Sequence, residues 1–480
     1  MKKSTAAQPQ SFLWHDYETF GTDPKRDRPA EFACWRTNEN FQPIEEPESF
    51  RCKPTLDYLP DPLACAITGI GPEVAYRDGL PEPEFAARVH AQMSRGQTCT
   101  LGYNSIRFDD EITRHLNWRN FLDPYEREWA NGNSRFDFID LTRATYALRP
   151  NAIEWPSRAD GHPSFKLSDL TEANALTHSH AHAALSDVEA TLGLASLLRL
   201  RQPRLVDFAL ELRRKSRVIE MLDWQQRTPL LHVSQRFPAE RGCTAIVVPL
   251  ALHPSQSGKV IVVDTFPSPM PLLSWPIERL AEMLVAPADS GERVALGLKL
   301  VHANRAPFLA PISVLAGVDL GRIQLDRAQS DIHTEQLRNA GGLDKKVQQI
   351  FRLLDSSVRD PADPDAALYE GFVPDSDRAL AKRFSVASPE ELAQIAAKFG
   401  DVRLRALAFR FRARHYPDTL NPSEQRIWLD QCRVQLQQSP RSLANFDTAT
   451  DELAARLPDV AMDLRTWGAR VRKHAGLGLV

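Results

Sequence analysis

The sequence predicts three consecutive domains: an α/β domain, a small β-rich domain and a helical domain. Strand-like and helix-like segments alternate over the first 200 residues, which is typical of an α/β domain. Short β-branched runs separated by prolines come next, and helical periodicities fill the rest of the chain. A chain of 480 residues is also long enough for about three domains.

In the first domain we expect strands separated by turns over residues 12–56, because Thr22-Asp23-Pro24 and Pro43 interrupt a strand-like composition. Apolar residues at helical spacing predict a helix over 82–93. Further along we expect, in order, a β-rich run over 98–104, a helix over 108–116 with an acidic first turn, a mixed segment over 137–147, a loop over 150–163 and helices over 167–175 and 182–200.

Two stretches predict the domain boundaries. Arg201-Gln202-Pro203-Arg204 ends the α/β pattern, and a run of Pro and Asp over 360–365 ends the β-rich part. The domains are therefore expected at residues 1–201, 202–358 and 359–480.

The second and third domains differ in their periodicity. β-branched runs over 245–250, 259–265 and 293–301 favour a small barrel. In the third domain, Ser388-Pro389-Glu390-Glu391 predicts a capped helix start, and Gly400 marks the expected end of that helix. Further helices are expected over 404–414, 424–436 and 464–474.

The composition is that of an ordinary soluble globular protein, with 42% hydrophobic and 25% charged residues. A formal net charge of −3 excludes a polycation, so nucleic-acid binding would need a local basic groove. The six cysteines include no C-x-x-C pair, which favours reduced thiols over a disulfide framework or a zinc site. There is no signal-peptide pattern and no apolar run near the ~18 residues that span a bilayer. We therefore expect a cytoplasmic protein without membrane contact.

Asp16 and Glu18 lie within an apolar, strand-like run that begins at Phe12 and closes with Gly21. Side chains at positions i and i+2 of a strand point to the same face, so the two carboxylates project together. Adjacent carboxylates repel each other unless a cation lies between them. Their oxygens are hard ligands that suit Mg²⁺ or Mn²⁺. The alternative is a pair of solvated acids on an edge strand, because an Asp-x-Glu triplet alone is common.

Three further residues have types and positions that suit catalysis. Asp109 follows Asn104-Ser105-Ile106-Arg107-Phe108 at the entry to a predicted helix, where the helix dipole favours an ionised carboxylate. His182 precedes Asp187 by five residues at the start of an apolar helix. Taken singly, Asp109 is also compatible with a structural acid at a helix start, His182 with a surface histidine and Asp187 with a solvated helix acid.

The order of these motifs resembles the DEDDh branch of the ribonuclease-H-like 3′–5′ exonucleases. Asp-x-Glu comes first, Asp after Asn-x-x-x-Phe second, and His-x-x-x-x-Asp last. Beyond the motifs, the chain is similar to the bacterial exodeoxyribonuclease I family over essentially its whole length. The segments that carry this similarity are the run Phe12-Leu13-Trp14-His15-Asp16-Tyr17-Glu18-Thr19-Phe20-Gly21, Ile67-Thr68-Gly69-Ile70, Tyr146-Ala147-Leu148-Arg149-Pro150, Arg201-Gln202-Pro203-Arg204-Leu205 and Leu368-Tyr369-Glu370-Gly371-Phe372.

The resemblance implies a ribonuclease-H-like exonuclease domain, an SH3-like second domain and a helical third domain. It also implies two-metal hydrolysis of single-stranded DNA from the 3′ end to 5′-mononucleotides, in repair and recombination. Asp16, Glu18 and Asp187 would ligate two Mg²⁺ ions, for which Mn²⁺ would substitute. Asp109 would hold the second metal directly or through water. His182 would take the proton of the attacking water, which suits a pKa of about 6.5.

The resemblance further implies contacts with DNA. Thr68-Gly69-Ile70 resembles the loop against the terminal nucleotide, since glycine permits close backbone approach; an ordinary tight turn is the alternative. Cations and stacking aromatics would bind the strand, although each is also compatible with a solvated charge or a core aromatic. The candidate substrate-binding residues are Glu18, Lys166, Thr68, Gly69, Arg114, Tyr125, Trp129, Arg143 and Lys215, with Arg213, Arg214 and Arg217 beside the last. The run Arg403, Arg405, Arg410, Arg412 and Arg414 could line the groove or form a solvated helix face.

The family also binds the acidic C-terminal tail of single-stranded-DNA-binding protein, and arginine is suited to capture its carboxylate. Arg149 and Arg338 are the candidates for that contact. Phe208 stands where relatives have Tyr, and Pro311 lies in a stretch without a firm alignment, which leaves the details of a tail site open. A monomer is expected from the resemblance alone.

Two rival functions remain at this point. An RNA-trimming or proofreading exonuclease of the same superfamily is disfavoured, because small relatives of that kind usually lack the two added domains. A catalytically silent DNA-binding scaffold is disfavoured because all five chemical residues are present. Chelation by EDTA would separate these readings, since binding should survive it and hydrolysis should not.

Overall fold

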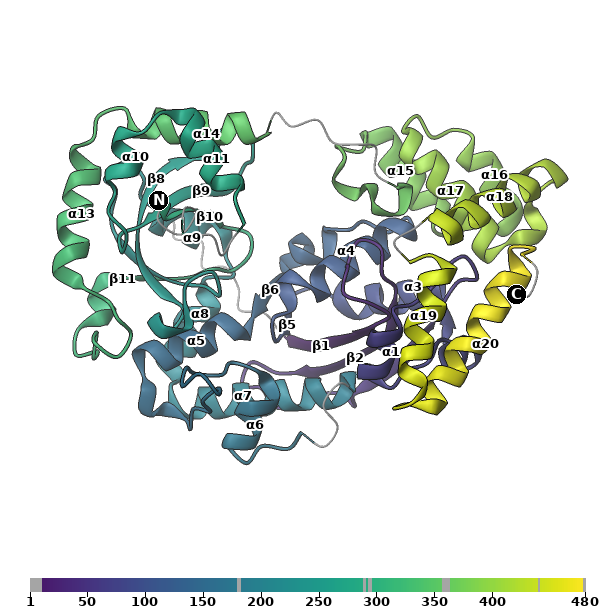
Figure 1. The fold of residues 1–480 in the computed structure, drawn as a ribbon, viewed down its shortest axis with the longest axis horizontal. Helices are drawn as coiled ribbons and strands as arrows, with labels where there is room; N and C mark the ends of the chain where they lie inside the picture. The colour runs from purple at the N-terminus through teal and green to yellow at the C-terminus, as the bar shows by residue number, and fades with distance from the viewer. Residues whose placement is uncertain are drawn as a thin grey trace. The chain divides into compact units, whose positions relative to one another are not determined.

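A computed structural model of the chain describes residues 11–178, 183–287, 291, 296–355, 363–438 and 441–477. These residues form two compact units (Figure 1). The first unit is built from Met1–Ser134, His178–Glu189 and Asp360–Val480, and the second from Arg135–Thr177 and Ala190–Arg359. The first unit therefore combines the N-terminal and C-terminal parts of the chain.

The strands of the first unit belong to a six-stranded mixed sheet with the order β4-β3-β2-β1-β5-β6, whose last strand is β6 Ser134–Asp137. β1 pairs with β2 in antiparallel orientation and with β5 in parallel orientation. The strands are β1 Ser11–Thr19, β2 Pro29–Thr37, β3 Glu48–Lys53, β4 Leu80–Pro81 and β5 Thr98–Gly102. The strands expected over 12–56 and 98–104 are thus confirmed.

β1 lies in the interior of this sheet, which explains its almost continuous apolar composition. Leu13 and Trp14 are fully buried. The pairing of β5 with β1 ends at Trp14, whereas β2 continues to pair with β1 through Glu18. The last residues of β1 therefore reach beyond the end of β5, at the carboxyl edge of the parallel pair, where α/β sheets commonly place their functional residues.

Helices connect the strands of this sheet and bury its apolar side chains. Phe85 and Met93 of α3, for example, pack with Leu13 and Phe32 of the sheet. The helices are α1 Pro62–Thr68, α2 Pro72–Asp78, α3 Glu82–Met93, α4 Asp109–Arg119 and the first residues of α7 Ala184–Arg201. The helices predicted over 82–93, 108–116 and 182–200 correspond to α3, α4 and α7.

The C-terminal part of the first unit is helical, as predicted, and shares its cores with the N-terminal part. Trp467 belongs to one cluster with Phe20 and Ile70, and Phe121 belongs to another with Phe399. The helices are α15 Asp375–Phe384, α16 Pro389–Ala396, α17 Val402–His415, α18 Pro422–Gln438, α19 Leu443–Ala454 and α20 Pro458–His474.

The capping box predicted at Ser388 is present and starts α16. The helix ends at Ala396, however, and not next to Gly400 as predicted. The backbone amide of Gly400 instead donates to Oδ1 of Asp377 at 3.1 Å. The glycine therefore belongs to a tertiary contact with α15 that the local pattern could not reveal.

The second unit contains a five-stranded antiparallel sheet with the order β10-β9-β8-β7-β11. Its strands are β7 Leu230–Val233, β8 Thr244–Leu252, β9 Lys259–Asp264, β10 Leu298–His302 and β11 Phe308–Pro311. The β-branched runs over 245–250 and 259–265 are β8 and β9. The run over 293–301 corresponds to β10 from residue 298, and residues 292–295 lie outside the described part.

Helices pack against this sheet. The β-branched runs of the sequence did not predict them. α11 and α14 bury their apolar faces in one cluster with β8 and β9. The helices of the second unit are α5 Phe138–Leu148, α6 Leu167–Ala173, the remainder of α7, α8 Pro203–Glu211, α9 Lys215–Met221, α10 Met270–Ser274, α11 Ile277–Val285, α13 Arg327–Asn339 and α14 Leu343–Asp355. Within the described ranges, no helix is long and apolar enough to cross a membrane.

A buried cluster of charges connects α17 to the sheet of the first unit. Asp365 lies 3.2 Å from Arg28, 3.1 Å from Arg410 and 2.6 Å from Arg414. Arg414 also binds Asp57 at 2.8 Å. Burial alone would raise the pKa of Asp365, but the charges of Arg414 and Arg28 hold it well below its ordinary value.

The alternative of a solvated helix face is wrong for Arg412 and Arg414, whose side chains are buried, whereas Arg405 is exposed. Arg412 is buried and donates to Glu424 at 2.8 Å, and Arg414 is enclosed by the cluster around Asp365. Arg403 donates to Asp401 at 2.6 Å and Arg405 donates to the carbonyl of Phe399 at 2.7 Å. The alternation of Arg with apolar residues indicated a helix, but not that its cations have buried partners.

Candidate active site

Asp16 and Glu18 project from the same face of β1, beyond the last residue that pairs with β5. The i, i+2 spacing predicted this, and the antiparallel register places Glu31 of β2 directly opposite Glu18. Glu18 is buried and Asp16 is half-buried. The strand thus presents two carboxylates in a place with limited access to water.

Asp109 approaches the same strand from the start of α4. Its Oδ1 accepts a hydrogen bond from the backbone amide of Tyr17 at 3.2 Å. Because β5 leads through a short turn into α4, the acid at the helix start comes to the carboxyl edge of the sheet. The predicted proximity of Asp109 to the Asp16–Glu18 pair is therefore present, and the side chain also bonds a strand amide beyond the end of β5.

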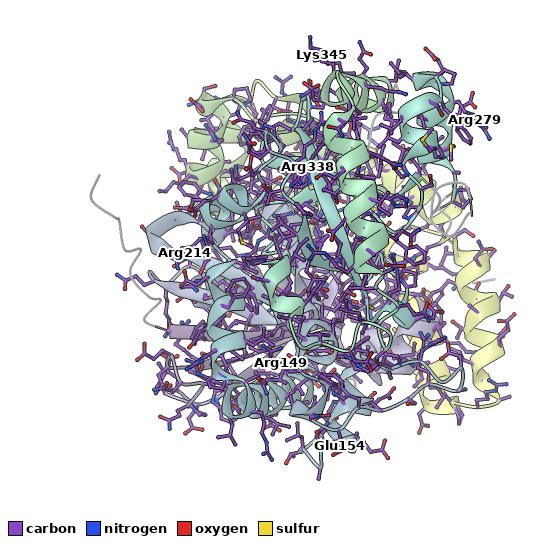
Figure 2. All side chains as sticks on the ribbon, turned by 90° about the vertical axis from the view of Figure 1, so that its left-hand side faces the viewer. Arg149, Glu154, Arg214, Arg279, Arg338 and Lys345 are labelled. Carbon is purple, nitrogen blue, oxygen red and sulfur yellow. The ribbon has the colours of Figure 1, made fainter. Side chains whose placement is uncertain are left out.

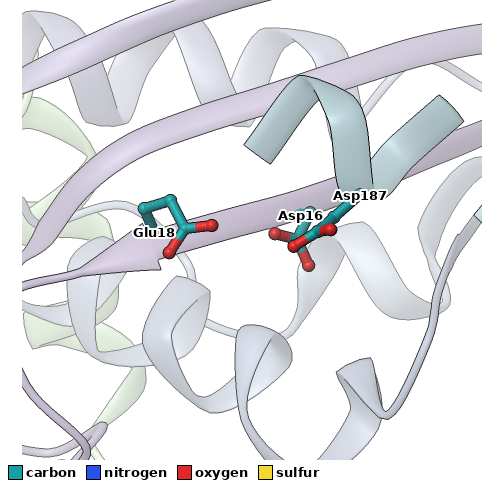
Figure 3. A group of neighbouring side chains, drawn as sticks. All are labelled: Asp16, Glu18 and Asp187. Carbon is teal, nitrogen blue, oxygen red and sulfur yellow. The ribbon is translucent and has the colours of Figure 1, made fainter. Parts of the chain in front are cut away.

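Asp187 completes a group of three carboxylates. It lies in the first turn of α7, where the helix dipole favours negative charge. Asp16, Glu18 and Asp187 each offer an oxygen atom such that all three atoms lie within 4.8 Å of one another. Figure 3 shows Asp187 reaching from α7 to Asp16 on β1, with Glu18 farther along the same strand.

The electrostatics of this group reflect mutual repulsion in a buried place. Burial and the charges of Asp109, Asp187, Glu18 and Glu31 raise the pKa of Asp16 well above its ordinary value. Burial and the charges of Asp187, Glu31 and Asp109 raise the pKa of Glu18 to about 8. Carboxylates that are so unfavourably placed as anions are stabilised when a cation binds between them.

The donor set fits a hard divalent cation. It consists only of carboxylate oxygens, and the described residues contribute no sulfur ligand to it. The two strand acids come from one rigid element and Asp187 from a second, so little backbone rearrangement is needed to enclose an ion. Asp109 lies outside the three-carboxylate group, although its charge acts on both strand acids.

His182, predicted as the general base, lies outside the described residues. The structure shows a different histidine in contact with the site: Nε2 of His178 lies 2.6 Å from Oδ1 of Asp187. Sequence reasoning missed His178. The available signal was the repetition of histidine at 178, 180 and 182 ahead of Asp187, which offers more than one imidazole to the same acid.

Thr68 is the last residue of α1, and Gly69 follows it in the short loop that leads to α2. Gly69 has a left-handed backbone (φ 68°) that favours glycine, and its amide donates to the carbonyl of Cys65 at 3.0 Å. The amide of Ile70 donates to Oγ1 of Thr68 at 3.2 Å. Thr68 is half-buried and Gly69 is exposed, so the turn presents backbone to its surroundings.

Comparison with known families agrees with this architecture. Three family models match in sequence: an exonuclease model over residues 13–195, the exonuclease I SH3-like domain over 213–353 and the exonuclease I C-terminal domain over 362–466. The exodeoxyribonuclease I of Escherichia coli K12 is 45% identical over 428 residues, which are 89% of this chain and 90% of that protein. The exodeoxyribonuclease I of Haemophilus influenzae is 39% identical over 460 residues, or 94% and 97% of the two chains.

The chain belongs to the exodeoxyribonuclease I family. The expected order of an exonuclease domain, an SH3-like domain and a helical C-terminal domain is thereby confirmed. The boundaries after residues 201 and 358 stay predictions, and the second falls in residues outside the described part.

Solved structures of the exodeoxyribonuclease I family superpose on nearly the whole chain. E. coli exonuclease I in complex with a dA16 oligonucleotide has a TM-score of 0.90 and 42% identity, and covers 97% of this chain and 99% of its own. A complex of exonuclease I with the C-terminal peptide of SSB has a TM-score of 0.89 and 40% identity, with 98% and 99% coverage.

In the first unit of this exodeoxyribonuclease I family member, the predicted DNA-binding residues differ in accessibility. Trp129 is 70% exposed, which suits a stacking surface. Arg114 is buried and donates to Glu128 at 2.7 Å and to Glu111 at 2.8 Å. Its guanidinium also lies 5.2 Å from the ring centroid of Tyr125. Arg114 therefore orders neighbouring side chains, including a candidate stacking residue.

In the second unit, Lys166 and Lys215 are exposed, while Arg143 is buried and binds Asp140 at 2.6 Å. The two candidates for the tail contact, Arg149 and Arg338, are both exposed and are labelled on the side of the second unit seen in Figure 2.

Each of the two tail candidates already has a local partner. Arg149 donates to the carbonyl of Leu148 at 2.6 Å, and Arg338 binds Glu335 at 2.8 Å. Phe208 contacts Phe308 with ring centroids 6.1 Å apart, and the exposed Pro311 ends β11.

Proposed function

We propose that the protein is a metal-dependent 3′–5′ exodeoxyribonuclease that degrades single-stranded DNA to 5′-mononucleotides in repair and recombination. The single observation that carries this function is the convergence of Asp16, Glu18 and Asp187, whose oxygens lie within 4.8 Å of one another on two elements of the exonuclease domain. Membership of the exodeoxyribonuclease I family supports the same reaction.

In this proposal, Asp16, Glu18 and Asp187 hold two Mg²⁺ ions, with Mn²⁺ as a substitute, and Asp109 holds the second one directly or through water. Bound divalent ions of this kind neutralise charge on the reacting phosphate and on the attacking and leaving oxygens. The protein's own contribution is to keep its carboxylates preorganised in a place with little water. His182 accepts the proton of the attacking water.

The polarity of the reaction is assigned to the turn at Thr68 and Gly69, which we propose lies against the 3′-terminal nucleotide. Its left-handed glycine supports this role because a backbone without Cβ allows a ribose or base to approach closely. Trp129 and Tyr125 provide surfaces for bases, with Arg114 behind Tyr125. Lys166, Arg143 and Lys215 are proposed as further contacts of the strand.

The proposed partner besides DNA is the C-terminal tail of a single-stranded-DNA-binding protein, with Arg149 and Arg338 as its contacts. The support is that both guanidinium groups are exposed and that an exonuclease I structure with an SSB C-terminal peptide resembles this chain. We further propose a cytoplasmic monomer whose three domains meet after residues 201 and 358.

The test is digestion of a single-stranded oligonucleotide labelled at its 5′ end, beside a copy blocked at the 3′ end, in the presence of Mg²⁺. We expect a ladder of shortened labelled products from the free strand only, and none after addition of EDTA. Asp187→Ala should lower kcat at least about a hundredfold, because loss of residues that merely orient metal ligands already costs about 10–100-fold. Glu189→Ala, on the same helix outside the carboxylate group, is the matched control.

Two results would contradict the proposal. Degradation of the blocked strand at the same rate would exclude 3′–5′ polarity. An intact oligonucleotide that is nevertheless bound, with Asp187→Ala equal to the wild type, would favour the scaffold function instead.

A further inference from the structure

Helix α2 begins without a capping side chain of its own. Its N-cap residue is Gly71, which makes no side-chain cap hydrogen bond. The amides that a cap would satisfy are bonded by Asp463 of α20. Its Oδ1 accepts from the amide of Glu73 at 3.0 Å and its Oδ2 accepts from the amide of Val74 at 3.2 Å. These are the N2 and N3 amides that an N-cap side chain normally bonds, so a carboxylate 390 residues away replaces a local cap.

Gly71 is explained by this contact and not by its backbone conformation. Its φ of −77° is available to any residue. A Cβ atom at this position would, however, overlap the carboxylate of Asp463. That carboxylate cannot move aside without losing both hydrogen bonds to α2. Gly71 and Asp463 therefore act together. Because Gly71 has no Cβ atom, the carboxylate of Asp463 from α20 has room to cap α2.

Other contacts fix α20 against the same helix. Both oxygens of Glu73 accept hydrogen bonds from Arg470, at 2.7 and 2.8 Å. The ring centroids of Tyr76 and Trp467 are 5.6 Å apart. Through charge, hydrogen bonds and aromatic packing, α20 thus contacts α2 from the first turn of α2 onward.

The loop before α2 is anchored through this arrangement. At its start, the amide of Gly69 is tied to α1. At its end, Ile70 is buried in one cluster with Leu464 and Trp467, and Gly71 leads directly into the capped turn. The backbone between the two anchors has little freedom while both of them hold. Loss of the cap would free two amide donors and loosen the first turn of α2 together with the loop.

We infer that Asp463 is a positioning residue of the exonuclease, which holds the loop at residues 68–71 in the conformation that receives the 3′-terminal nucleotide. This inference rests on the proposed function of that loop. It assigns a role in substrate recognition to the last helix of the C-terminal domain, through Asp463 and Gly71. The carboxylates of β1 and α7 do not depend on this contact, so the effect should fall on KM and not on kcat.

The test is a double-mutant cycle of Asp463→Ala and Gly71→Ser on the full chain. Asp463→Ala should raise KM for a single-stranded oligonucleotide about fivefold, because the loss of a helix cap typically changes an equilibrium constant by about that factor. We expect kcat to stay within about twofold of the wild type. Gly71→Ser alone should also raise KM, because its side chain collides with the carboxylate. The double variant should return KM to within about twofold of the wild type, because the introduced hydroxyl can cap α2 in the space that the shorter side chain vacates.

Arg465→Ala is the matched control on the same helix, since Arg465 is exposed and its guanidinium binds Asp451 of α19 at 2.8 Å. Its KM should not change. Additive impairment in the double variant, or a KM unchanged by Asp463→Ala, would overturn the inference, even if thermal stability falls.

Amide hydrogen exchange gives a readout that does not depend on activity. In Asp463→Ala, exchange at Glu73, Val74 and Ile70 should become faster, and the double variant should restore protection. If the wild type fails to digest DNA from the 3′ end, the proposed function fails, and this exchange pattern still supports control of the loop by α20. Unchanged exchange at these three amides would overturn the inference whatever the activity.

Discussion

Asp16, Glu18 and Asp187 are brought together by two elements, β1 and α7. The register of β1 with β2 fixes the two strand acids, and the first turn of α7 fixes the third. The cost of this arrangement is electrostatic, since burial and neighbouring charges raise the pKa of Glu18 to about 8. The site is therefore least favourable for the fold when it is fully ionised and without a cation.

This predicts a specific dependence of stability on pH. The pKa of Glu18 in the folded protein lies above its ordinary value of 4.5, so deprotonation favours the unfolded state. Without metal, stability should fall as pH rises from about 4.5 through about 8. Stabilisation by Mg²⁺ should grow over the same window, because the ion binds the charged carboxylates of the folded protein.

The measurement is Tm by calorimetry in EDTA and in Mg²⁺ at several pH values from 5 to 9. Each kcal/mol by which Mg²⁺ binding raises the free energy of unfolding should raise Tm by about 2–4 °C. Glu31→Gln, which removes one of the charges that act on Glu18, should make the decline in EDTA shallower. A Mg²⁺-induced shift that is equal at all pH values would contradict the electrostatic account.

At this scale the sequence predicted that the two strand acids share a face, but it did not single out His178 as a partner of Asp187. The pairing of Asp16 with Glu18 follows from the two-residue period of a strand, which is a local property. The contact of His178 with Asp187 joins residues on either side of a segment with further histidines at 180 and 182, and no local rule selects one of the three. The partnership of Asp463 with α2 has no local signal at all, because it joins residues 390 positions apart.

At the scale of secondary structure elements, α17 carries an arginine that takes part in a buried cluster of ion pairs. Its Arg414 lies in a buried cluster with Asp57 and Asp365, both of which are also buried. Ion pairs in such places are strongly interdependent, because removal of one member leaves an uncompensated buried charge. The contribution of Arg414 to stability therefore depends on its acidic partners.

Asp365→Asn should lower the free energy of unfolding by about 3–5 kcal/mol, since Arg28 and Arg414 would lose their shared buried partner. Asp363→Asn is the matched control. Its side chain is 43% exposed, it binds Arg410, and asparagine can still cap the following turn, so the loss should stay below about 1 kcal/mol. The free energy of unfolding of both variants should be measured by denaturant titration. Equal decreases would show that the buried ion pairs of Asp365 contribute no more to stability than the exposed ion pair of Asp363.

Prediction of the elements succeeded where a local rule determined them. Ser388 starts α16 because its capping box is complete within four residues. The end of that helix was misplaced because Gly400 serves a contact with Asp377. In the second unit, α6 and α7 were predicted, but α11 and α14 were not, because the β-branched runs near them favoured a barrel.

At the scale of the whole molecule, the first unit has hydrophobic cores that combine two distant parts of the chain. Trp467 of α20 is fully buried with Phe20 and Ile70, and its Nε1 donates to the carbonyl of Tyr58 at 3.0 Å. The C-terminal helices are therefore part of the support of the exonuclease sheet and not an independent appendage.

Trp467→Ala should cost about 3–5 kcal/mol and shorten the lifetime of exonuclease activity at elevated temperature, because it opens a cavity in the shared core. Met462→Ala on the same helix changes a side chain that is 66% exposed and should be nearly neutral. Parallel measurements of unfolding and of residual activity after heating test this. A destabilised C-terminal part with unaffected activity lifetime would show that the two parts do not share a core.

The combination of Met1–Ser134 with Asp360–Val480 also bears on how the protein is made. During synthesis, β1 and its acids are made before the second unit, and α20 is made after it. For that period β1 lacks the helices that support its sheet. Until then Phe20 and Ile70 lack their partners from α20, and the chain exposes apolar surface that chaperones recognise. A chain that lacks α20 should therefore be less stable and more prone to aggregation than the full chain.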